Sequence, residues 1–391
     1  MNKLYHALIL VFICMLVAGS LPAGAEGVNI HGFISQGYLK TNQNNYLAET
    51  DDGSFQFNEM GINFTTFATS DLKIGCQFFA RDLGDVGNDE IIINWAFAEY
   101  TYRNWLGLRA GILKYAFTLY NETRDFDSLR TSIFLPSSVY NEWLRDGFNK
   151  MKGIELFGLT GLGPLGMLEY QFQTGVAPTA LNSGTTKYLT EMPTSELGSL
   201  TNAEPDTTYA ARLIWNLPID GLRIGGSYIR SGLLYEGTVK DYGLPISIDI
   251  KKADVYSFYA EYTYQNLKIA VENYWSESEA TSTITLPNGD PYVRKTKTKD
   301  GDTYYASLGY RFTDWFEAGY YYSTAEGGAD DKGDLNTLED HCLSLRFDIN
   351  PNWIAKLEAH VMEGKAGVEP DNDGHVYNEW MLYAAKMSFS F

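Results

Sequence analysis

The sequence predicts an all-β fold, a transmembrane antiparallel β-barrel of about 16 strands with short turns at one end and long loops at the other. Three observations predict it. The chain of 391 residues begins with a secretion signal, ends in an alternating segment that stops on an aromatic residue, and carries alternating runs between turn signals along its length. Successive side chains of a strand point to opposite faces, so such runs have one apolar and one polar face.

The amino-terminal segment 1–25 is predicted to be a signal peptide that is removed after Ala25. It contains one basic residue, Lys3, followed by an apolar stretch over 7–18 and an A-x-A pattern at 23–25. The apolar stretch is shorter than the ~20 residues that a spanning helix needs. Residues 26–391 contain no linker rich in proline or serine, so we expect a single barrel domain.

The composition excludes some function classes and favours a membrane setting. A formal net charge of −19 argues against nucleic acid as a partner. Aromatic residues make up 15% of the chain, including 28 Tyr and 8 Trp. Such a content is typical of barrels whose rings form belts at the two membrane interfaces.

The spacing of cysteine and histidine predicts neither a metal site nor an enzyme. Cys76 and Cys342 have no partners at metal-ligand spacing. We expect two isolated thiols, with a long-range disulfide as the alternative. None of the other candidate side chains, His31, His341, His360 and His375, lies in a nucleophile or metal-ligand motif, so no cofactor is expected.

Turn signals and longer polar segments alternate along the chain. The short turn signals lie at 69–71, 103–105, 161–164, 217–221, 265–266, 313–314 and 350–352. The longer polar segments are 44–54, 83–90, 119–149, 176–207, 234–252, 278–302, 325–340 and 364–378. Seven turns and eight loops separate sixteen strands, and sixteen strands are enough to enclose an aqueous channel.

Individual segments support this count, with one exception. The runs 72–81 and 353–362 each have one apolar and one polar face. In the run 91–102, however, Glu99 falls on the same face as Ile93, Trp95 and Phe97. A β-bulge that shifts the register, or a wrong strand boundary, would account for this pattern.

Two segments carry a resemblance to a known family. The last strand, which ends at Phe391, resembles the terminal strand of Gram-negative outer-membrane barrels, and the segment 106–120 is similar to the porin strand that leads into the third outside loop. Over the whole mature sequence the chain resembles the general, trimeric, 16-stranded porins. The resemblance implies an outer-membrane homotrimer that forms a water-filled channel for passive diffusion of small hydrophilic solutes.

The same resemblance implies specific partners and a constriction. Phe391 would be read by the barrel-assembly machinery, and the finished barrel would contact outer-membrane lipid and lipopolysaccharide. Segment 119–149 would fold into the barrel and narrow it, which places Arg124, Asp125, Asp127 and Arg130 near the narrowest section.

Alternation also predicts which charged residues face the lumen, because polar groups cannot face hydrocarbon cheaply. The predicted bases are Lys73, Arg81, Arg109, Arg212, Arg223, Lys268, Arg311, Arg346, Lys356 and Lys386. The predicted acids are Glu169, Glu261, Glu272, Glu317, Asp348 and Glu358. This excess of bases predicts a preference for anions, for which Arg109, Arg212, Arg346 and Lys386 are the mid-strand candidates.

Three alternatives stay open at this stage. The charges could pair across the lumen and stiffen the wall, which would weaken the preference for anions. The loops could carry a binding or adhesion function. The barrel could instead be a sheath around another protein, without general pore activity.

Overall fold

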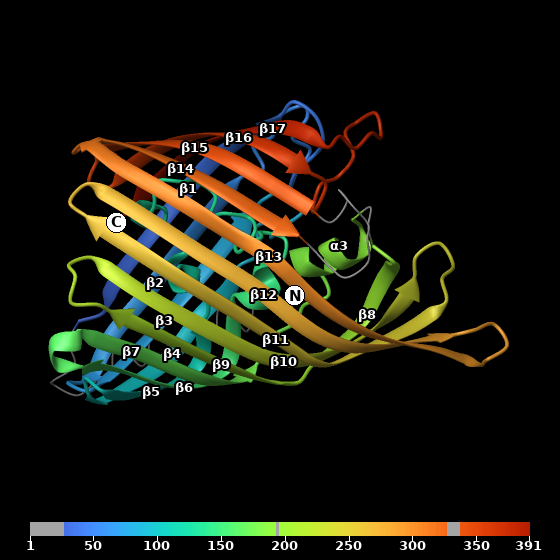
Figure 1. The fold of residues 1–391 in the computed structure, drawn as a ribbon, viewed down its shortest axis with the longest axis horizontal. Helices are drawn as coiled ribbons and strands as arrows, with labels where there is room; N and C mark the ends of the chain where they lie inside the picture. The colour runs from blue at the N-terminus through green and yellow to red at the C-terminus, as the bar shows by residue number, and fades with distance from the viewer. Residues whose placement is uncertain (1–26, 193–194, 327–336) are drawn as a thin grey trace.

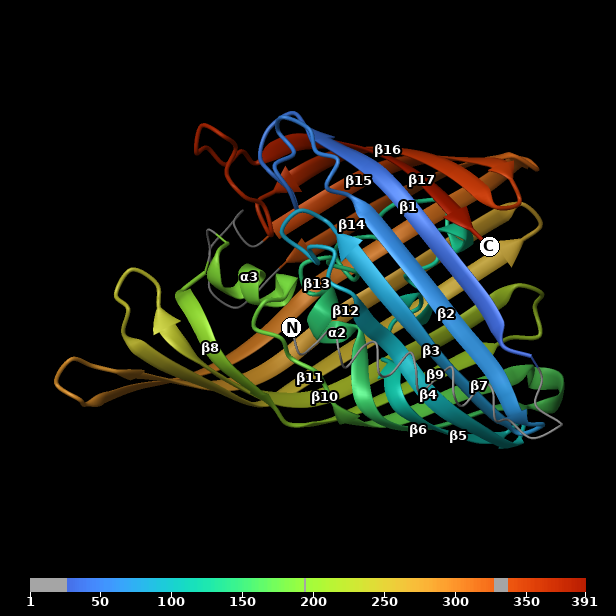
Figure 2. The same ribbon diagram turned by 180° about the vertical axis from the view of Figure 1, so that it is seen from behind.

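The computed structural model describes residues 27–192, 195–326 and 337–391 as one closed antiparallel sheet (Figures 1 and 2). The predicted signal peptide lies outside these residues, as does most of the predicted loop 325–340. The strands are β1 (Asn29–Thr41), β2 (Asn58–Thr69), β3 (Leu72–Asp82), β4 (Ile92–Arg103), β5 (Leu106–Lys114), β6 (Lys150–Gly161), β7 (Met167–Val176), β8 (Leu197–Pro205), β9 (Thr207–Asn216), β10 (Leu222–Val239), β11 (Pro245–Tyr264), β12 (Leu267–Thr285), β13 (Pro291–Thr313), β14 (Phe316–Glu326), β15 (Thr337–Asn350), β16 (Trp353–Gly364) and β17 (Glu379–Ser390).

These seventeen elements form a wall of sixteen strands, as predicted. β8 and β9 both pair with β10, and the Asp206 N–H between them donates to the Gly232 carbonyl at 2.9 Å. They are therefore two parts of one strand. β17 pairs with β1 and closes the barrel.

The seven predicted turns join the strands at one end of the barrel, where both termini of the wall also lie (Figure 1). Two of the predicted loops, 234–252 and 278–302, are wrong. Most of their residues continue β10 to β13 as paired strands that project beyond the rest of the barrel. Both faces of a projecting hairpin meet water, so its strands lose the apolar face by which a strand is recognised.

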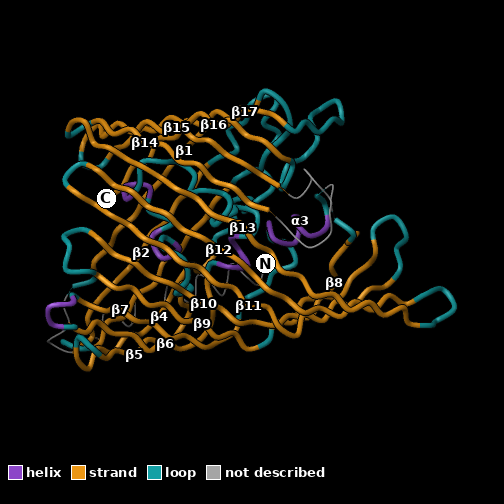
Figure 3. Tube along the Cα trace, viewed as in Figure 1, coloured by secondary structure: helices purple, strands orange, loops and turns teal. Residues whose placement is uncertain are grey.

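Short helices interrupt the connections (Figure 3). They are η1 (Asn121–Thr123), η2 (Asp127–Leu129), α2 (Arg145–Phe148), η3 (Gly163–Leu165) and α3 (Gly184–Thr190). Across the described ranges, no helix has both the length and the apolar character needed to span a membrane.

The two faces of the wall follow the predicted alternation. Apolar side chains such as Leu343 and Val361 point outward and are more than half exposed, at 53% and 54%. Lys356 and Lys386 point inward and are buried, and they lie opposite each other in the pairing of β16 with β17. An apolar outer surface around a charged interior is the arrangement that lipid requires of a barrel.

The exception in β4 is a β-bulge, one of the two explanations that the sequence left open. Gln77 pairs with Trp95 and Phe78 pairs with Ile93, so Asn94 is the extra residue. Beyond the bulge, Trp95 and Glu99 share the inner face of the wall, while Ile93 pairs on the outer face.

The carboxy-terminus completes the closure. The Phe391 backbone exchanges two hydrogen bonds with Gly32, of 3.0 and 3.1 Å, and the ring is 53% exposed on the outer face. A Cβ added at Gly32 would lie 2.5 Å from an atom of this ring, so Gly32 leaves the space in which the ring sits.

Candidate channel constriction

Segment 115–149, which joins β5 to β6, lies inside the barrel rather than beyond its rim (Figure 2). The sequence predicted this segment as 119–149, which begins four residues later. In the order of the wall strands, β14 and β15 lie on the side opposite β5 and β6. The segment contacts both sides, and its contacts define the geometry of the lumen.

On the near side, the segment is fixed by wall side chains of β4 and β7. Gln173 of β7 accepts a hydrogen bond from the Ala116 N–H at 2.9 Å. Asn94, the bulge residue of β4, donates to Asp125 at 2.6 Å. The bulge therefore places a polar side chain where the segment needs a donor.

On the far side, cationic side chains hold backbone carbonyls of the segment. Arg346 of β15 donates to the Ser128 carbonyl at 2.7 Å, and Lys356 of β16 donates to the carbonyls of Asp127 and Ser132 at 2.7 and 2.8 Å. These bonds join residues more than 200 positions apart in the chain. Segment 115–149 thus reaches across the full width of the lumen.

Glu272 of β12 makes a third attachment between the near and far walls. Its carboxylate accepts hydrogen bonds from the Leu119 N–H at 3.0 Å and the Tyr140 hydroxyl at 2.8 Å. Tyr305 of β13 donates to the same carboxylate at 3.2 Å. A buried carboxylate needs several donors because the charge has left water.

A network of ion pairs connects the segment to β2 and β17. Arg145 pairs with Asp125 at 2.6 Å and with Glu59 of β2 at 2.9 Å. Lys386 of β17 pairs with Glu59 at 2.6 Å and with Asp127 at 2.7 Å. All five side chains are buried, so this network lies under the segment and away from bulk solvent.

Apolar side chains fill the space on the long-loop side of this network. Phe134 stacks on Phe57 with ring centroids 5.3 Å apart and an interplanar angle of 5°. Trp143 is 1% exposed and donates from its indole N–H to the Gly367 carbonyl at 3.1 Å. The interior therefore contains a packed core, whereas the alternation of the strands predicts only a wet wall.

The structure brings the predicted site residues together, but as members of ion pairs rather than as free charges. Arg109 lies between Glu99 and Glu155 at 2.6 and 2.9 Å. Four further predicted cations also pair with an acid: Arg124 with Glu142, Arg130 with Asp127, Arg212 with Glu122, and Arg346 with Asp348. Charge pairing, which the sequence left open, is thus present around each of these cations, either within the wall or with segment 115–149.

Sequence reasoning missed several residues of this network. Glu59 and Lys114 are absent from the predicted inward set, yet Glu59 binds two cations and Lys114 pairs with Asp125 at 2.8 Å. Alternation in β2 could have found Glu59, because Met60 and Ile62 point outward. Lys114 is the last residue of β5, where a strand boundary decides the face.

The structure also corrects the expectation that cysteine and histidine are isolated. Cys342, Glu358 and His360 lie together on the inner face, with donor atoms within 4.8 Å of one another. No short-range motif contains them because they lie on two strands, β15 and β16. Counting outward from the turn at 350–352 places Cys342 opposite His360, and this signal could have found the group.

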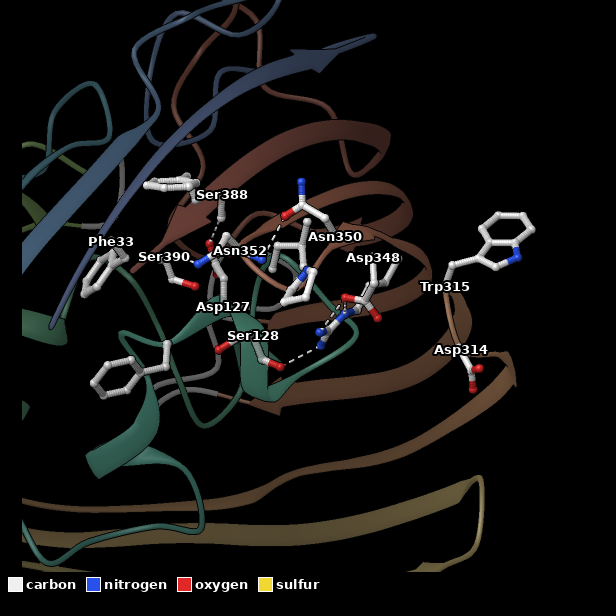
Figure 4. Close-up of a pocket in the computed structure, with 15 residues that line it drawn as sticks. Phe33, Asp127, Ser128, Asp314, Trp315, Asp348, Asn350, Asn352, Ser388 and Ser390 are labelled. Atoms are coloured by element: carbon white, nitrogen blue, oxygen red, sulfur yellow. Dashed lines mark hydrogen bonds and ion pairs between the residues drawn. The ribbon is translucent and has the colours of Figure 1, made fainter.

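Below the segment, a cavity of about 470 Å³ opens toward the short-turn end of the barrel. Figure 4 shows Asp127, Ser128 and Ser388 on one side of it and Asp348, Asn350 and Asn352 toward the turns. Ser388 donates to Asp127 at 2.6 Å. The cavity is a vestibule whose inner end is segment 115–149.

No protein-family model matches the sequence, and no curated protein sequence matches it. Solved structures do match. The outer-membrane channel DcaP of Acinetobacter baumannii aligns with a TM-score of 0.55 at 12% identity, over 94% of this chain and 98% of that chain. The chain has the porin fold.

Two further structures with the porin fold are similar over almost their whole length. Salmonella typhi OmpF, in a complex with daunomycin, aligns with a TM-score of 0.56 at 13% identity, over 93% of this chain and 97% of that chain. An anion-selective porin from Comamonas acidovorans aligns with a TM-score of 0.51 at 12% identity, over 94% of this chain and all of that chain, at 100%. At such low sequence identities, the structural similarity establishes the fold alone.

Proposed function

We propose that the protein is an outer-membrane porin, a channel for passive diffusion of small hydrophilic solutes, in which segment 115–149 forms the constriction. The observation that carries the proposal is a closed sixteen-strand barrel with an apolar outside and a charged interior, crossed by this segment. A barrel that size has room for an aqueous path beside an inserted segment. The contacts on all sides imply a narrow path and a low conductance.

The test is planar-bilayer recording of the purified, refolded protein. Steady single-channel steps are expected, and heat-modifiable migration on gels should accompany them as the sign of a folded barrel. Folded protein that never conducts would overturn the proposal. It would favour a binding protein instead, for which the projecting hairpins of β10 to β13 offer a large surface (Figure 1).

A preference for anions is a finer proposal, and the ion pairs limit its size. The wall strands carry the excess of bases on which the expectation rests, but Glu59, Glu99 and Glu155 also pair with inward cations. Paired charges produce a weak field beyond a few ångströms. We therefore propose a small anion preference, measured as the zero-current potential in a KCl gradient at low salt, where screening is least.

We also propose a homotrimer, since one of the similar structures is a trimer form of OmpT from Vibrio cholerae with a TM-score of 0.53. Light scattering on the detergent-solubilised protein tests this state. Contacts with lipopolysaccharide and recognition by the barrel-assembly machinery remain part of the same proposal. A sheath function is less compatible with a lumen that segment 115–149 already occupies.

A further inference from the structure

A group of soft and borderline metal donors lies on the inner face of β15 and β16. In the pairing of the two strands, Cys342 is directly opposite His360, and Ser344 is opposite Glu358. Side chains that alternate with a period of two place Glu358 and His360 on the same face. The register of the sheet therefore brings the thiol, the imidazole and the carboxylate together, and none of the three residues lies in a loop.

The distances between the donor atoms match the edges of a tetrahedron around a metal ion. His360 Nε2 lies 3.7 Å from Cys342 Sγ and 3.3 Å from Glu358 Oε2. Zinc bonds of ~2.0 to 2.3 Å to oxygen, nitrogen and sulfur give tetrahedral edges of about 3.3 to 3.6 Å. Two of the three donor–donor distances are thus close to such edges, and all three donors lie within 4.8 Å of one another.

The imidazole is also oriented in the way that metal-binding histidines are. Its other nitrogen, Nδ1, lies 3.0 Å from Asp340 Oδ1, and Tyr321 donates to the same carboxylate at 2.9 Å. A carboxylate on the far nitrogen fixes the tautomer that leaves Nε2 free to bind a metal. Asp340 and Tyr321 are themselves buried, at 2% and 3% exposed, so this outer shell is rigid.

Two other accounts of the same residues explain less. An imidazolium between Asp340 and Glu358 would explain the two carboxylates, but not the thiol beside Nε2. Cys342, His360 and Asp340 also have the order of a nucleophile, a base and an orienting acid. The Cys342 side chain is 0% exposed and His360 is 1% exposed, so no substrate can reach the sulfur.

We propose that Cys342, Glu358 and His360 bind a divalent cation of the zinc class. A thiolate, an imidazole and a carboxylate together suit zinc better than magnesium or calcium, which prefer oxygen ligands alone. Ser344, whose hydroxyl lies 3.4 Å from Cys342 Sγ, borders the fourth position. The site is structural in character, since it is closed to solvent and lies under segment 115–149.

The position of the site links metal binding to the constriction. Glu358 accepts hydrogen bonds from the Ile133 N–H at 2.6 Å and the Phe134 N–H at 3.2 Å. One carboxylate therefore holds both segment 115–149 and the proposed ion. A bound ion should hold Glu358 in place and thereby reduce the mobility of this part of the segment.

The test uses the full-length mature protein, refolded with Co²⁺ or Zn²⁺ and freed from excess metal. We expect about one Co²⁺ per chain and a thiolate-to-cobalt absorption band in the near ultraviolet. Cys342→Ser should abolish the band, and His360→Gln should remove retained metal. Asp340→Asn, which changes the orienting carboxylate alone, should weaken metal affinity 10- to 100-fold.

Matched controls are available on the same sheet. Cys76→Ser and His341→Gln change a thiol and an imidazole outside the group and should retain the metal and the band. Heat-modifiable migration shows that each variant has folded. Wild-type protein that folds without retaining metal, or Cys342→Ser that binds cobalt with an unchanged spectrum, would overturn the proposal.

Discussion

At the scale of single residues, Lys386 is a position where substitution should reduce the stability of the fold. It is buried and pairs with both Glu59 and Asp127, and its ammonium also lies 5.1 Å from the centre of the Phe57 ring. Removing this charge would leave Glu59 with Arg145 and Asp127 with Arg130 as their remaining cationic partners, and a buried charge that loses part of its compensation is costly. Lys386 therefore connects β17, β2 and segment 115–149 through one charge.

We predict that Lys386→Met lowers the free energy of unfolding by about 3 kcal/mol, the lower end of the usual cost for a broken buried ion pair. Urea titration of the protein in lipid vesicles measures it. Lys297→Met is the control, because Lys297 is 80% exposed and pairs only at the surface of a projecting hairpin. Equal losses in both variants would show that burial of Lys386 is unimportant.

Glu369, in the connection between β16 and β17, should make the stability of the folded state depend on pH. Burial raises the pKa of its carboxyl to about 7 from 4.5, and the charge of Asp85 acts in the same direction. The folded state therefore holds the proton more tightly than the unfolded chain. The resulting stabilisation is complete below about pH 4.5 and is lost as the pH rises through 7.

We predict that the loop around Glu369 loosens between pH 6 and 8. This loop is paired to the first long loop through two backbone hydrogen bonds of 3.0 Å between Glu369 and Asn45. Hydrogen exchange of residues 365–378, corrected for the intrinsic rate, measures the change. Glu369→Gln should remove the pH dependence, and a dependence that survives this substitution would assign it to another group.

At the scale of elements, segment 115–149 is the one that we propose as the constriction of the barrel. It contacts β7 and β4 on one side and β15 and β16 on the other, and its aromatic side chains pack against the wall. Backbone carbonyls held by Arg346 and Lys356 give it a fixed position. These attachments hold the segment to opposite sides of the wall.

We predict that shortening segment 115–149 between residues 126 and 139 raises single-channel conductance several-fold, because it removes the part that crosses to the far wall. Planar-bilayer recording measures it. The control is a shorter hairpin at 278–302, which projects outside the barrel and should hardly change conductance. Similar effects from both deletions would place the narrowest section elsewhere.

The last strand supplies a second prediction at this scale. Phe391 seals the junction of β17 with β1 through its backbone bonds to Gly32. Without it, the N–H and the carbonyl of Gly32 would lose their partners at the seam of the barrel, and unpaired backbone groups in lipid are costly. Deleting Phe391 should sharply reduce the heat-modifiable, folded form in cells, whereas Phe55→Ala, in an exposed loop, should not. Normal assembly without Phe391 would show that closure does not depend on it.

At the scale of the whole molecule, the distribution of charge separates two regions. Inside the barrel many acids and bases are joined in ion pairs, and the projecting segments 234–252 and 278–302 each contain as many bases as acids. The net charge of −19 therefore resides mainly in the other long loops. A negative rim repels anions at the mouth and would oppose the small anion preference that we propose for the interior. We expect the measured anion preference to be smaller when the loops face the low-salt side, where the rim is screened least.

That expectation has a direct measurement. Zero-current potentials of the wild-type protein are recorded twice, with salt gradients of opposite direction. One mouth of the barrel faces low salt in the first recording and the other mouth in the second. We predict that selectivity differs between the two orientations, because the loops lie at one end only. Identical potentials would show that the rim does not reach the conducting path.

The sequence by itself determined the wall. A two-residue period, seven turn signals and a terminal aromatic are local features, so they predicted sixteen strands, the inward position of Arg346 and Lys386, and the bulge near Glu99 as one of two options. The period failed only where lipid is absent. In the projecting parts of β10 to β13, both faces meet water and the pattern that marks a strand disappears.

Tertiary structure alone decided what the inward charges do. The hydrogen bond from Arg346 to the Ser128 carbonyl joins residues 218 positions apart, and the grouping of Cys342 with Glu358 and His360 depends on the register between two strands. Alternation gives the direction of a side chain but not its partner. The partners follow from how segment 115–149 lies across the lumen, because only closure of the barrel brings its opposite walls within reach of one segment.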